Sequence, residues 1–352
     1  MKQHTRILSL LLACLLLGGI FPSCGQKPQA YKAYSLDYFD TATTITGYAE
    51  SQEEFDTVSD EILAELGEYH RLYTIYHRFE GLENLCTVNE LAEGQHRTVT
   101  VDRRIIDLLL YAKEMYTLTG GKLNIAMGSI LSIWHDYREM GMSDPASAEL
   151  PPMEKLTEAA RHTDINCLMI DEENSTVTIT DPAMRLDVGA IAKGYAVEMV
   201  ARSLEERGIT GYVINVGGNV RTVGAKGDGS PWVAGIENPD TDAEEPYVAY
   251  LKLSGESVVT SGSYQRYYLV NGKRFHHIID SETLMPAEGF QSVSVVCKHS
   301  GQGDALSTAL FCMPFEEGLT LVESLPDAEA FWVLPDGTTR QSDGFAAYIT
   351  QP

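Results

Sequence analysis

The sequence predicts an α+β fold, in which helices and strands are mixed in one large domain. Helical and strand patterns follow one another irregularly, not as the strand–helix–strand units of a doubly wound sheet. No internal repeat, low-complexity block or clear linker interrupts residues 31–352, so we expect a single domain there. The chain of 352 residues, 44% of them apolar, is long enough to bury a sizeable core.

The individual elements follow from residue spacing. Apolar residues at helical spacing predict helices over 51–71, 102–119, 189–207 and 303–313. Alternating or β-branched runs predict strands over 34–49, 213–216, 232–236, 248–253, 293–296, 331–334 and 345–349, and a hairpin over 168–170 and 176–180. Three prolines indicate a loop over 139–152.

The N-terminus has the pattern of an export signal. Two basic residues precede an apolar run over 7–20, which is too short to span a bilayer comfortably. A small residue directly before Cys24 resembles a bacterial lipoprotein cleavage site. We therefore expect a signal peptide over 1–23, a lipidated Cys24 and a polar tether over 24–30. An uncleaved anchor is the alternative, and it would place the domain on the same side of the membrane.

The charge of the chain limits its partners. Its 26 basic and 50 acidic side chains give a formal net charge of −24, and loss of segment 1–23 with its two basic residues leaves −26. Such a charge argues against nucleic acid and against anionic lipid headgroups as partners. A phosphate ligand would need a local cation or a metal ion to overcome this field.

Four cysteines remain after the predicted lipidated one: Cys86, Cys167, Cys297 and Cys312. None belongs to a C-x-x-C pair, so neither a zinc knuckle nor a thioredoxin-like site is indicated. In an exported protein a disulfide and buried free thiols are both compatible with this pattern.

The segment 185–195 has the pattern of an anion site. A predicted strand ends at Asp187, passes through a glycine turn at 189 and enters a helix whose first turn contains Lys193. A helix N-terminus presents free N–H groups that suit a phosphate. A lysine there opposes the helix dipole, which an anionic ligand would justify. The alternative is a solvated lysine beside an ordinary turn. The spacing matches neither the P-loop nor the dinucleotide-binding glycine pattern.

Asp304 and Thr308 would lie one helical turn apart on the same face. A carboxylate and a hydroxyl are hard oxygen ligands of the kind that Mg²⁺ prefers, and Mg²⁺ usually adds waters and substrate phosphates. The alternative is structural, because Asp304 follows a glycine and would serve well as a helix N-cap.

Two further segments carry polar side chains suited to a ligand. In the segment 276–283, His277 and Asp280 flank two apolar residues, so that His277 can act as acid, base or hydrogen-bond donor; a structural turn histidine is the alternative. In the segment 260–266, small hydroxylated residues surround a glycine, and Arg266 could pair with a phosphate or a carboxylate. The turn over 215–219 is similarly rich in glycine.

Taken together, these segments resemble the FAD:protein FMN transferases, the ApbE-type flavin transferases. The matching runs are Phe39-Asp-Thr-Ala-Thr-Thr, Leu186-Asp-Val-Gly-Ala-Ile-Ala-Lys-Gly-Tyr-Ala, Asn215-Val-Gly-Gly-Asn, Val259-Thr-Ser-Gly-Ser-Tyr-Gln-Arg, His277-Ile-Ile-Asp and Asp304-Ala-Leu-Ser-Thr. They occur in the family's order and span nearly the whole mature chain.

The resemblance implies a monomeric α+β fold with a flavin cleft and a reaction in which FAD and a protein Thr or Ser give a protein-bound FMN phosphoester and AMP. It implies that Asp304 and Thr308, with the carbonyl of Ala190, hold Mg²⁺. His277 is our candidate for the base that accepts the hydroxyl proton, and Asp280 is the reserve. The residues expected to contact FAD are Asp187, Lys193, Thr260, Ser261, Gly262 and Arg266.

The same resemblance implies an extracytoplasmic, lipid-anchored protein whose acceptor is a flavoprotein subunit of a membrane redox complex. Two other functions stay open from the residues alone. One is a magnesium-dependent FAD pyrophosphatase, in which water replaces the protein hydroxyl. The other is a non-catalytic flavin-binding lipoprotein, which would not need the Asp304–Thr308 pair.

Overall fold

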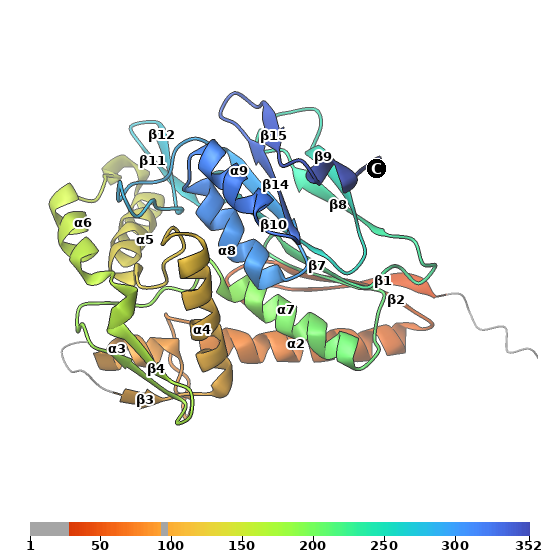
Figure 1. The fold of residues 1–352 in the computed structure, drawn as a ribbon, viewed down its shortest axis with the longest axis horizontal. Helices are drawn as coiled ribbons and strands as arrows, with labels where there is room; N and C mark the ends of the chain where they lie inside the picture. The colour runs from red at the N-terminus through yellow and green to blue at the C-terminus, as the bar shows by residue number, and fades with distance from the viewer. Residues whose placement is uncertain (1–27, 93–97) are drawn as a thin grey trace, which may run out of the picture.

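An eight-stranded antiparallel sheet forms the centre of the molecule in the computed structural model, which describes residues 28–92 and 98–352 (Figure 1). Its strand order is β1-β2-β6-β7-β10-β13-β14-β15. These strands are β1 (Gln29–Ser35), β2 (Thr43–Ala49), β6 (Tyr212–Val216), β7 (Asn219–Val223), β10 (Ser257–Gly262), β13 (Ser292–Cys297), β14 (Ala328–Val333) and β15 (Thr339–Gln341). Strands far apart in the sequence are thus neighbours, and together with the helices they confirm the α+β class.

Helices cover one face of this sheet and a second, smaller sheet covers the other (Figure 1). The helices of the first face are α2 (Gln52–Tyr73), α7 (Ala192–Glu206), α8 (Ser300–Phe311) and α9 (Phe315–Glu323), and α4 (Arg103–Leu118) packs against α2 and α8. The small sheet, in the order β16-β9-β8, consists of β8 (Trp232–Glu237), β9 (Tyr247–Leu253) and β16 (Ile349–Thr350).

Strand β13 shows why both faces are covered. All six of its residues are buried, and its side chains alternate between the two sides of the sheet. Val293 and Val295 belong to the core cluster under the helices, whereas Val296 belongs to the cluster under the small sheet. A strand whose two faces are both buried needs a layer on each side to keep its valines from water.

A smaller layer stands beside this main body. It consists of α5 (Gly128–Ser143), α6 (Met153–Ala159) and the hairpin of β11 (Tyr267–Val270) with β12 (Lys273–His276). Trp134 of α5 packs with Tyr268 and Phe275 of the hairpin in an apolar cluster of their own. The remaining elements are α3 (Leu85–Ala92) and a three-stranded sheet of β3 (Thr98–Thr100), β5 (Thr176–Ile179) and β4 (Leu168–Asp171).

The predicted helices over 51–71, 102–119, 189–207 and 303–313 are all present, although the last two begin elsewhere. Helix α2 starts where Ser51 accepts a hydrogen bond from the backbone N–H of Glu54, as expected of an N-cap. Helix α7 begins only at 192, and α8 begins three residues early, at Ser300, because the side chain of His299 caps it.

Four other expectations were wrong in detail. The strand expected over 34–49 is two strands, separated by a loop in which Phe39 and Asp40 have left-handed φ values of 56° and 51°. Residues 139–143, expected in a loop, belong to α5. Residues 345–349 form a short 3₁₀ turn and the start of β16 instead of one strand. The segment 185–187 lies outside every sheet, although Arg185 makes an isolated bridge to Met127.

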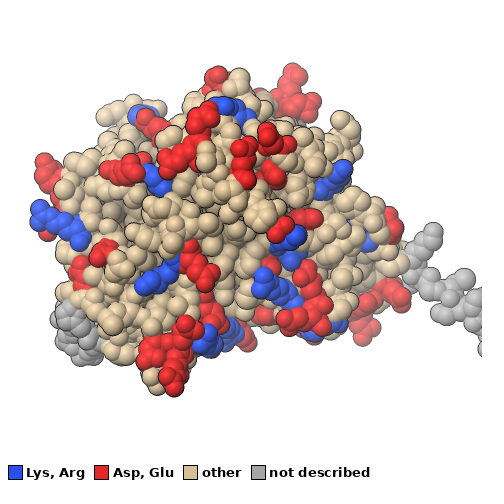
Figure 2. All heavy atoms as spheres, in the orientation of Figure 1, with Lys and Arg blue, Asp and Glu red and all other residues tan. Residues whose placement is uncertain are grey.

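The structure also bears on the cysteines, the membrane and the surface charge. Cys86, Cys167, Cys297 and Cys312 are all free thiols, three of them buried. Among the residues that the structure describes, no helix has the length and apolar character needed to cross a membrane. In the view of Figure 2, acidic side chains spread over the lower edge and the top of the molecule with basic side chains between them. Cys24 and the predicted signal peptide lie outside the described residues.

Candidate active site

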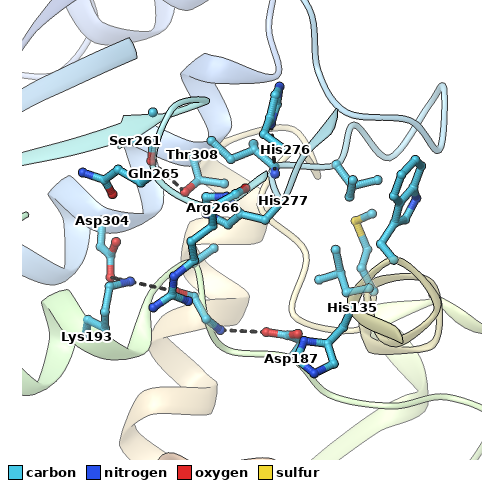
Figure 3. Close-up of a pocket in the computed structure, with 18 of the residues that line it drawn as sticks. His135, Asp187, Lys193, Ser261, Gln265, Arg266, His276, His277, Asp304 and Thr308 are labelled. Atoms are coloured by element: carbon cyan, nitrogen blue, oxygen red, sulfur yellow. Dashed lines mark hydrogen bonds and ion pairs between the residues drawn. The ribbon is translucent and has the colours of Figure 1, made fainter. Parts of the chain in front are cut away.

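One cavity, at the junction of the main body and the smaller layer, brings together almost all of the predicted site residues (Figure 3). The predicted residues that line it are Asp187, Ala190, Lys193, Thr260, Ser261, Gly262, Arg266, His277, Asp304 and Thr308. They come from the segment before α7 and its first turn, the end of β10 and the loop after it, the residue that follows β12, and the middle of α8. Asp280 is the exception among the described residues.

The segment before α7 is held in place from two sides. The backbone N–H of Asp187 donates to the carbonyl of Ile125 over 2.8 Å, and the side-chain amide of Asn89 pairs with both backbone groups of Leu186. The carboxylate of Asp187 accepts a hydrogen bond from the N–H of Gly189 over 2.8 Å. Burial raises the pKa of this carboxyl above its usual value, and hydrogen bonding to Gly189 opposes the shift. These contacts satisfy the backbone groups of the segment, so it stays extended without belonging to a sheet.

Asp304 is not the N-cap of its own helix, which corrects that alternative. His299 caps α8, and Asp304 lies in the second turn, where its side chain reaches α7. Its Oδ2 accepts a hydrogen bond from the backbone N–H of Gly194 over 2.9 Å and lies 3.7 Å from the ammonium of Lys193 (Figure 3). The carboxylate therefore binds the N-terminal turn of the neighbouring helix.

Gly194 is required for this approach. A Cβ atom at position 194 would lie 2.6 Å from the Cβ of Asp304 and 2.9 Å from Oδ1 of Asn219, closer than real side chains come. The absence of a side chain thus lets α7, α8 and the start of β7 meet at one point. Lys193, the residue before Gly194, donates to the carbonyl of Gly189 over 3.0 Å and lines the cavity.

Hydroxyl groups form the wall beside Asp304. Ser261 Oγ lies 3.2 Å from the hydroxyl of Thr308 and 2.8 Å from that of Ser307. Thr260, one residue earlier on β10, instead pairs with Ser294 of the neighbouring strand over 2.7 Å. Thr308 and Asp304 are therefore adjacent on α8, with a third hydroxyl within reach.

His277 lies on the opposite wall (Figure 3). Its Nδ1 is 3.2 Å from the backbone carbonyl of Arg266, which can only accept, so Nδ1 carries the proton. Nε2 is then the basic nitrogen. Burial and the nearby guanidinium of Arg266 lower the pKa of His277 to about 3, so the ring is neutral near pH 7. His276 differs, because both of its ring nitrogens bond the backbone, at Ala287 and Ile278.

Asp280 lies outside the cavity wall. Its Oδ1 accepts a hydrogen bond from the backbone N–H of Glu282 over 2.8 Å and lies 3.7 Å from the ammonium of Lys122. The carboxylate is thus used in the turn after His277 and in an ion pair. This placement makes Asp280 a poorer candidate for the base than His277.

Several lining residues were not singled out from the sequence. The ring of Tyr76 contacts that of His135 at a tilt of 32°, and His135 lies 3.0 Å from the guanidinium of Arg138, one helical turn away on α5. His135 and Asp187 face each other in Figure 3. The i, i+3 spacing of His135 and Arg138 was a signal that the two would share a helix face. The sequence analysis did not use this spacing, because it predicted no helix over 128–143.

The cavity reverses the charge of the rest of the chain. Four cationic side chains line it, Lys122, Arg138, Lys193 and Arg266, against two carboxylates, a net formal charge of +2 in a chain of −24. Such a site with low-dielectric walls attracts anions that the outer surface repels. Together with the helix N-terminus at α7, it suits the phosphates of a nucleotide.

The donors near Asp304 fit a magnesium ion. A carboxylate and a hydroxyl lie one turn apart on α8, and Oδ1 of Asn219, which has no hydrogen-bond partner, is buried beside them. No group of three or more His, Cys, Asp or Glu side chains that could hold a metal occurs within residues 28–92 and 98–352. A site with one carboxylate and neutral oxygens is typical of Mg²⁺ completed by substrate phosphates, and untypical of zinc.

The lowered pKa of His277 predicts a pH dependence of stability. Between its pKa of about 3 in the fold and its ordinary value of 6.5, the unfolded chain binds more protons at this site than the folded chain does. The free energy of unfolding therefore rises with pH through this window, and the contribution is complete above it. We expect the melting temperature of wild type to fall more between about pH 7 and about pH 4 than that of His277→Gln. If calorimetry gave the same fall in melting temperature for both proteins, His277 would not be held neutral by the fold.

Fold and cavity together define an α+β protein with a cationic, oxygen-lined cleft of the kind that binds a nucleotide diphosphate. The ApbE family matches residues 39–332, and the chain belongs to this family. It is 33% identical to a FAD:protein FMN transferase of Klebsiella pneumoniae, over 75% of this chain and 81% of that one. It is 31% identical to the enzyme of the same name from Treponema pallidum, over 72% of each chain.

Solved structures agree with the fold. The ApbE protein of Thermotoga maritima superposes with a TM-score of 0.78 at 27% identity, covering 92% of this chain and all of that one. The flavin transferase ApbE of Vibrio cholerae superposes with a TM-score of 0.74 at 24% identity, covering 91% of this chain and 99% of that one. The α+β architecture predicted from the sequence is thus that of the family.

Proposed function

We propose that this protein transfers FMN from FAD to a Thr or Ser hydroxyl of an acceptor protein and releases AMP, in a magnesium-dependent reaction. One observation carries the proposal: the motifs shared with the flavin transferases meet in a single cationic cavity of an otherwise acidic protein. The names of the relatives support the same activity.

The residues divide between binding and proton transfer. Lys193, Arg266 and the N-terminus of α7 would bind the pyrophosphate and hold it in line with the acceptor hydroxyl. Asp304, Thr308 and the carbonyl of Ala190 would hold Mg²⁺, which neutralises charge on the phosphates when it is bound.

Nε2 of His277 would accept the proton of the hydroxyl as its oxygen forms a bond to the phosphorus of the FMN half. The bond from that phosphorus to the bridging oxygen then breaks, and AMP leaves with this oxygen. With a pKa of about 3, His277 is a weak base in the empty cavity. The negative pyrophosphate would counter Arg266 and raise that pKa toward the range of an effective base.

We also propose that the mature protein is a lipid-anchored monomer outside the cytoplasm, acting on a flavoprotein subunit of a membrane redox complex. The support is the signal-like pattern over 1–23 with Cys24, and the resemblance described above.

The test combines the purified protein with FAD and Mg²⁺, with and without a candidate acceptor subunit. We expect AMP release that depends on the acceptor, and an acceptor band that fluoresces after denaturing electrophoresis. AMP release at the same rate without any acceptor, and without a fluorescent band, would instead identify a FAD pyrophosphatase. Flavin binding without AMP release would identify a flavin carrier, and either result would overturn the transferase.

A further inference from the structure

The side chain of Asn219 is buried in the cavity without using its amide oxygen. Asn219 begins β7, directly after the glycine turn at 217–218, and is 2% exposed. Its Oδ1 has no hydrogen-bond partner, and its Nδ2 makes only a 3.5 Å contact to the carbonyl of Val216. Burying an amide oxygen without a partner costs free energy, and most buried polar atoms in native proteins have a partner. Because Asn219 lines the cavity, a group bound there can supply the missing partner of Oδ1.

The position of this oxygen indicates what that group is. The point where Gly194 would carry a Cβ lies 2.9 Å from Oδ1 of Asn219 and 2.6 Å from the Cβ of Asp304. An amide oxygen and a carboxylate thus flank the same turn of α7. The N–H of Gly194 is already bonded to Asp304, and the ammonium of Lys193 bonds the carbonyl of Gly189 and lies 3.7 Å from Oδ2 of Asp304. Neither donor bonds Oδ1 of Asn219. Two acceptors side by side favour a cation between them.

We propose that Oδ1 of Asn219 is a further ligand of the divalent cation, beside Asp304 and Thr308. This proposal rests on the magnesium-dependent reaction proposed above. An amide oxygen is a hard ligand that Mg²⁺ accepts. It is also uncharged, so it adds a coordination bond without adding repulsion toward the pyrophosphate. Because β7 is an interior strand between β6 and β10, the ligand is held on a rigid element.

The direct test measures metal binding, not turnover. Mn²⁺ is titrated into the wild-type protein, with and without FAD, and free Mn²⁺ is followed by its electron paramagnetic resonance signal. We expect Asn219→Ala to weaken Mn²⁺ binding by about tenfold or more. Asn219→Asp keeps an oxygen and adds charge, so it should bind Mn²⁺ at least as tightly as wild type.

Ser257→Ala is the matched control. Ser257 lies on the neighbouring strand β10, and its hydroxyl is also buried and unpartnered, but it does not line the cavity. Its removal should leave Mn²⁺ binding unchanged. A melting-temperature measurement covers the case in which Asn219→Ala folds poorly. Without metal, Asn219→Asp should melt lower than wild type because two carboxylates face each other, and Mn²⁺ should raise its melting temperature more than that of wild type.

The possible outcomes distinguish a failure of the ligand role of Asn219 from a failure of the proposed FMN transfer. Wild-type Mn²⁺ affinity in Asn219→Ala, or no extra Mn²⁺ stabilisation of Asn219→Asp, would overturn the ligand role. Asn219→Ala and Asn219→Asp could instead weaken FAD binding in the absence of metal, with the larger loss for the aspartate. That result would mean that the NH₂ group of Asn219 donates to the phosphates, and it would also overturn the proposal. If wild type binds Mn²⁺ but no FAD, the proposed function fails, while the titrations without FAD still decide the role of Asn219.

Discussion

Replacing His277 by glutamine is expected to slow FMN transfer by about 10²- to 10⁴-fold, the usual contribution of a positioned base. FAD binding, measured by quenching of flavin fluorescence, should remain because the cationic residues and α7 are intact. The physical reason is the tautomer: the carbonyl of Arg266 holds the proton on Nδ1 and leaves Nε2 free to accept one. Single-turnover transfer to an acceptor, compared with binding, is the measurement.

His162→Gln provides the control for this prediction. His162 pairs with Asp181 over 2.8 Å and does not line the cavity, so its replacement should leave transfer unchanged. Transfer at the wild-type rate in His277→Gln would rule out His277 as the base. A loss of FAD binding equal to the loss of transfer would make it a binding residue instead.

Replacing Asp304 by asparagine is expected to remove most magnesium-dependent turnover. Asparagine keeps an oxygen that can accept from the N–H of Gly194, so the contact between α7 and α8 survives. It removes the only negative charge among the proposed metal ligands. Because a catalytic metal contributes several kcal/mol, we expect a loss of at least about 10²-fold, with a higher Mg²⁺ requirement in steady-state assays.

The neighbouring ligand gives a graded comparison. Thr308→Ser keeps the hydroxyl and should retain most of the activity, whereas Thr308→Val removes it at nearly constant volume and should lose activity at low Mg²⁺. Excess EDTA should abolish turnover of wild type, and added Mg²⁺ should restore it. Full activity of Asp304→Asn, or of wild type in EDTA, would remove the metal from the mechanism.

The sequence was informative where chemistry forces particular residue types into short runs. The lysine in the first turn of α7 and the acid–hydroxyl pair on α8 could be placed on helices because periodicity fixes the spacing within one element. The α+β class followed from the irregular mixture of patterns. Within a single element, local rules were therefore sufficient.

Local rules could not predict which helices and strands contact one another. Helix α5 was missed, since its N-cap residue Met127 makes no side-chain cap, and the missed helix carries His135 and Arg138. Asp304 was open to a reading as a cap because nothing in one sequence shows that Gly194, 110 positions earlier, donates to it. The buried oxygen of Asn219 likewise depends on how β7 meets two helices.

Arg266 joins two distant parts of the chain in one residue. Its side chain donates over 3.1 Å to the carbonyl of Asp40, in the left-handed loop that follows β1, and its own carbonyl fixes the imidazole of His277. Arg266 thereby links the loop after β1 to His277, the proposed proton acceptor. The orientation of the His277 ring therefore depends on a loop more than two hundred positions earlier in the chain, through this one arginine.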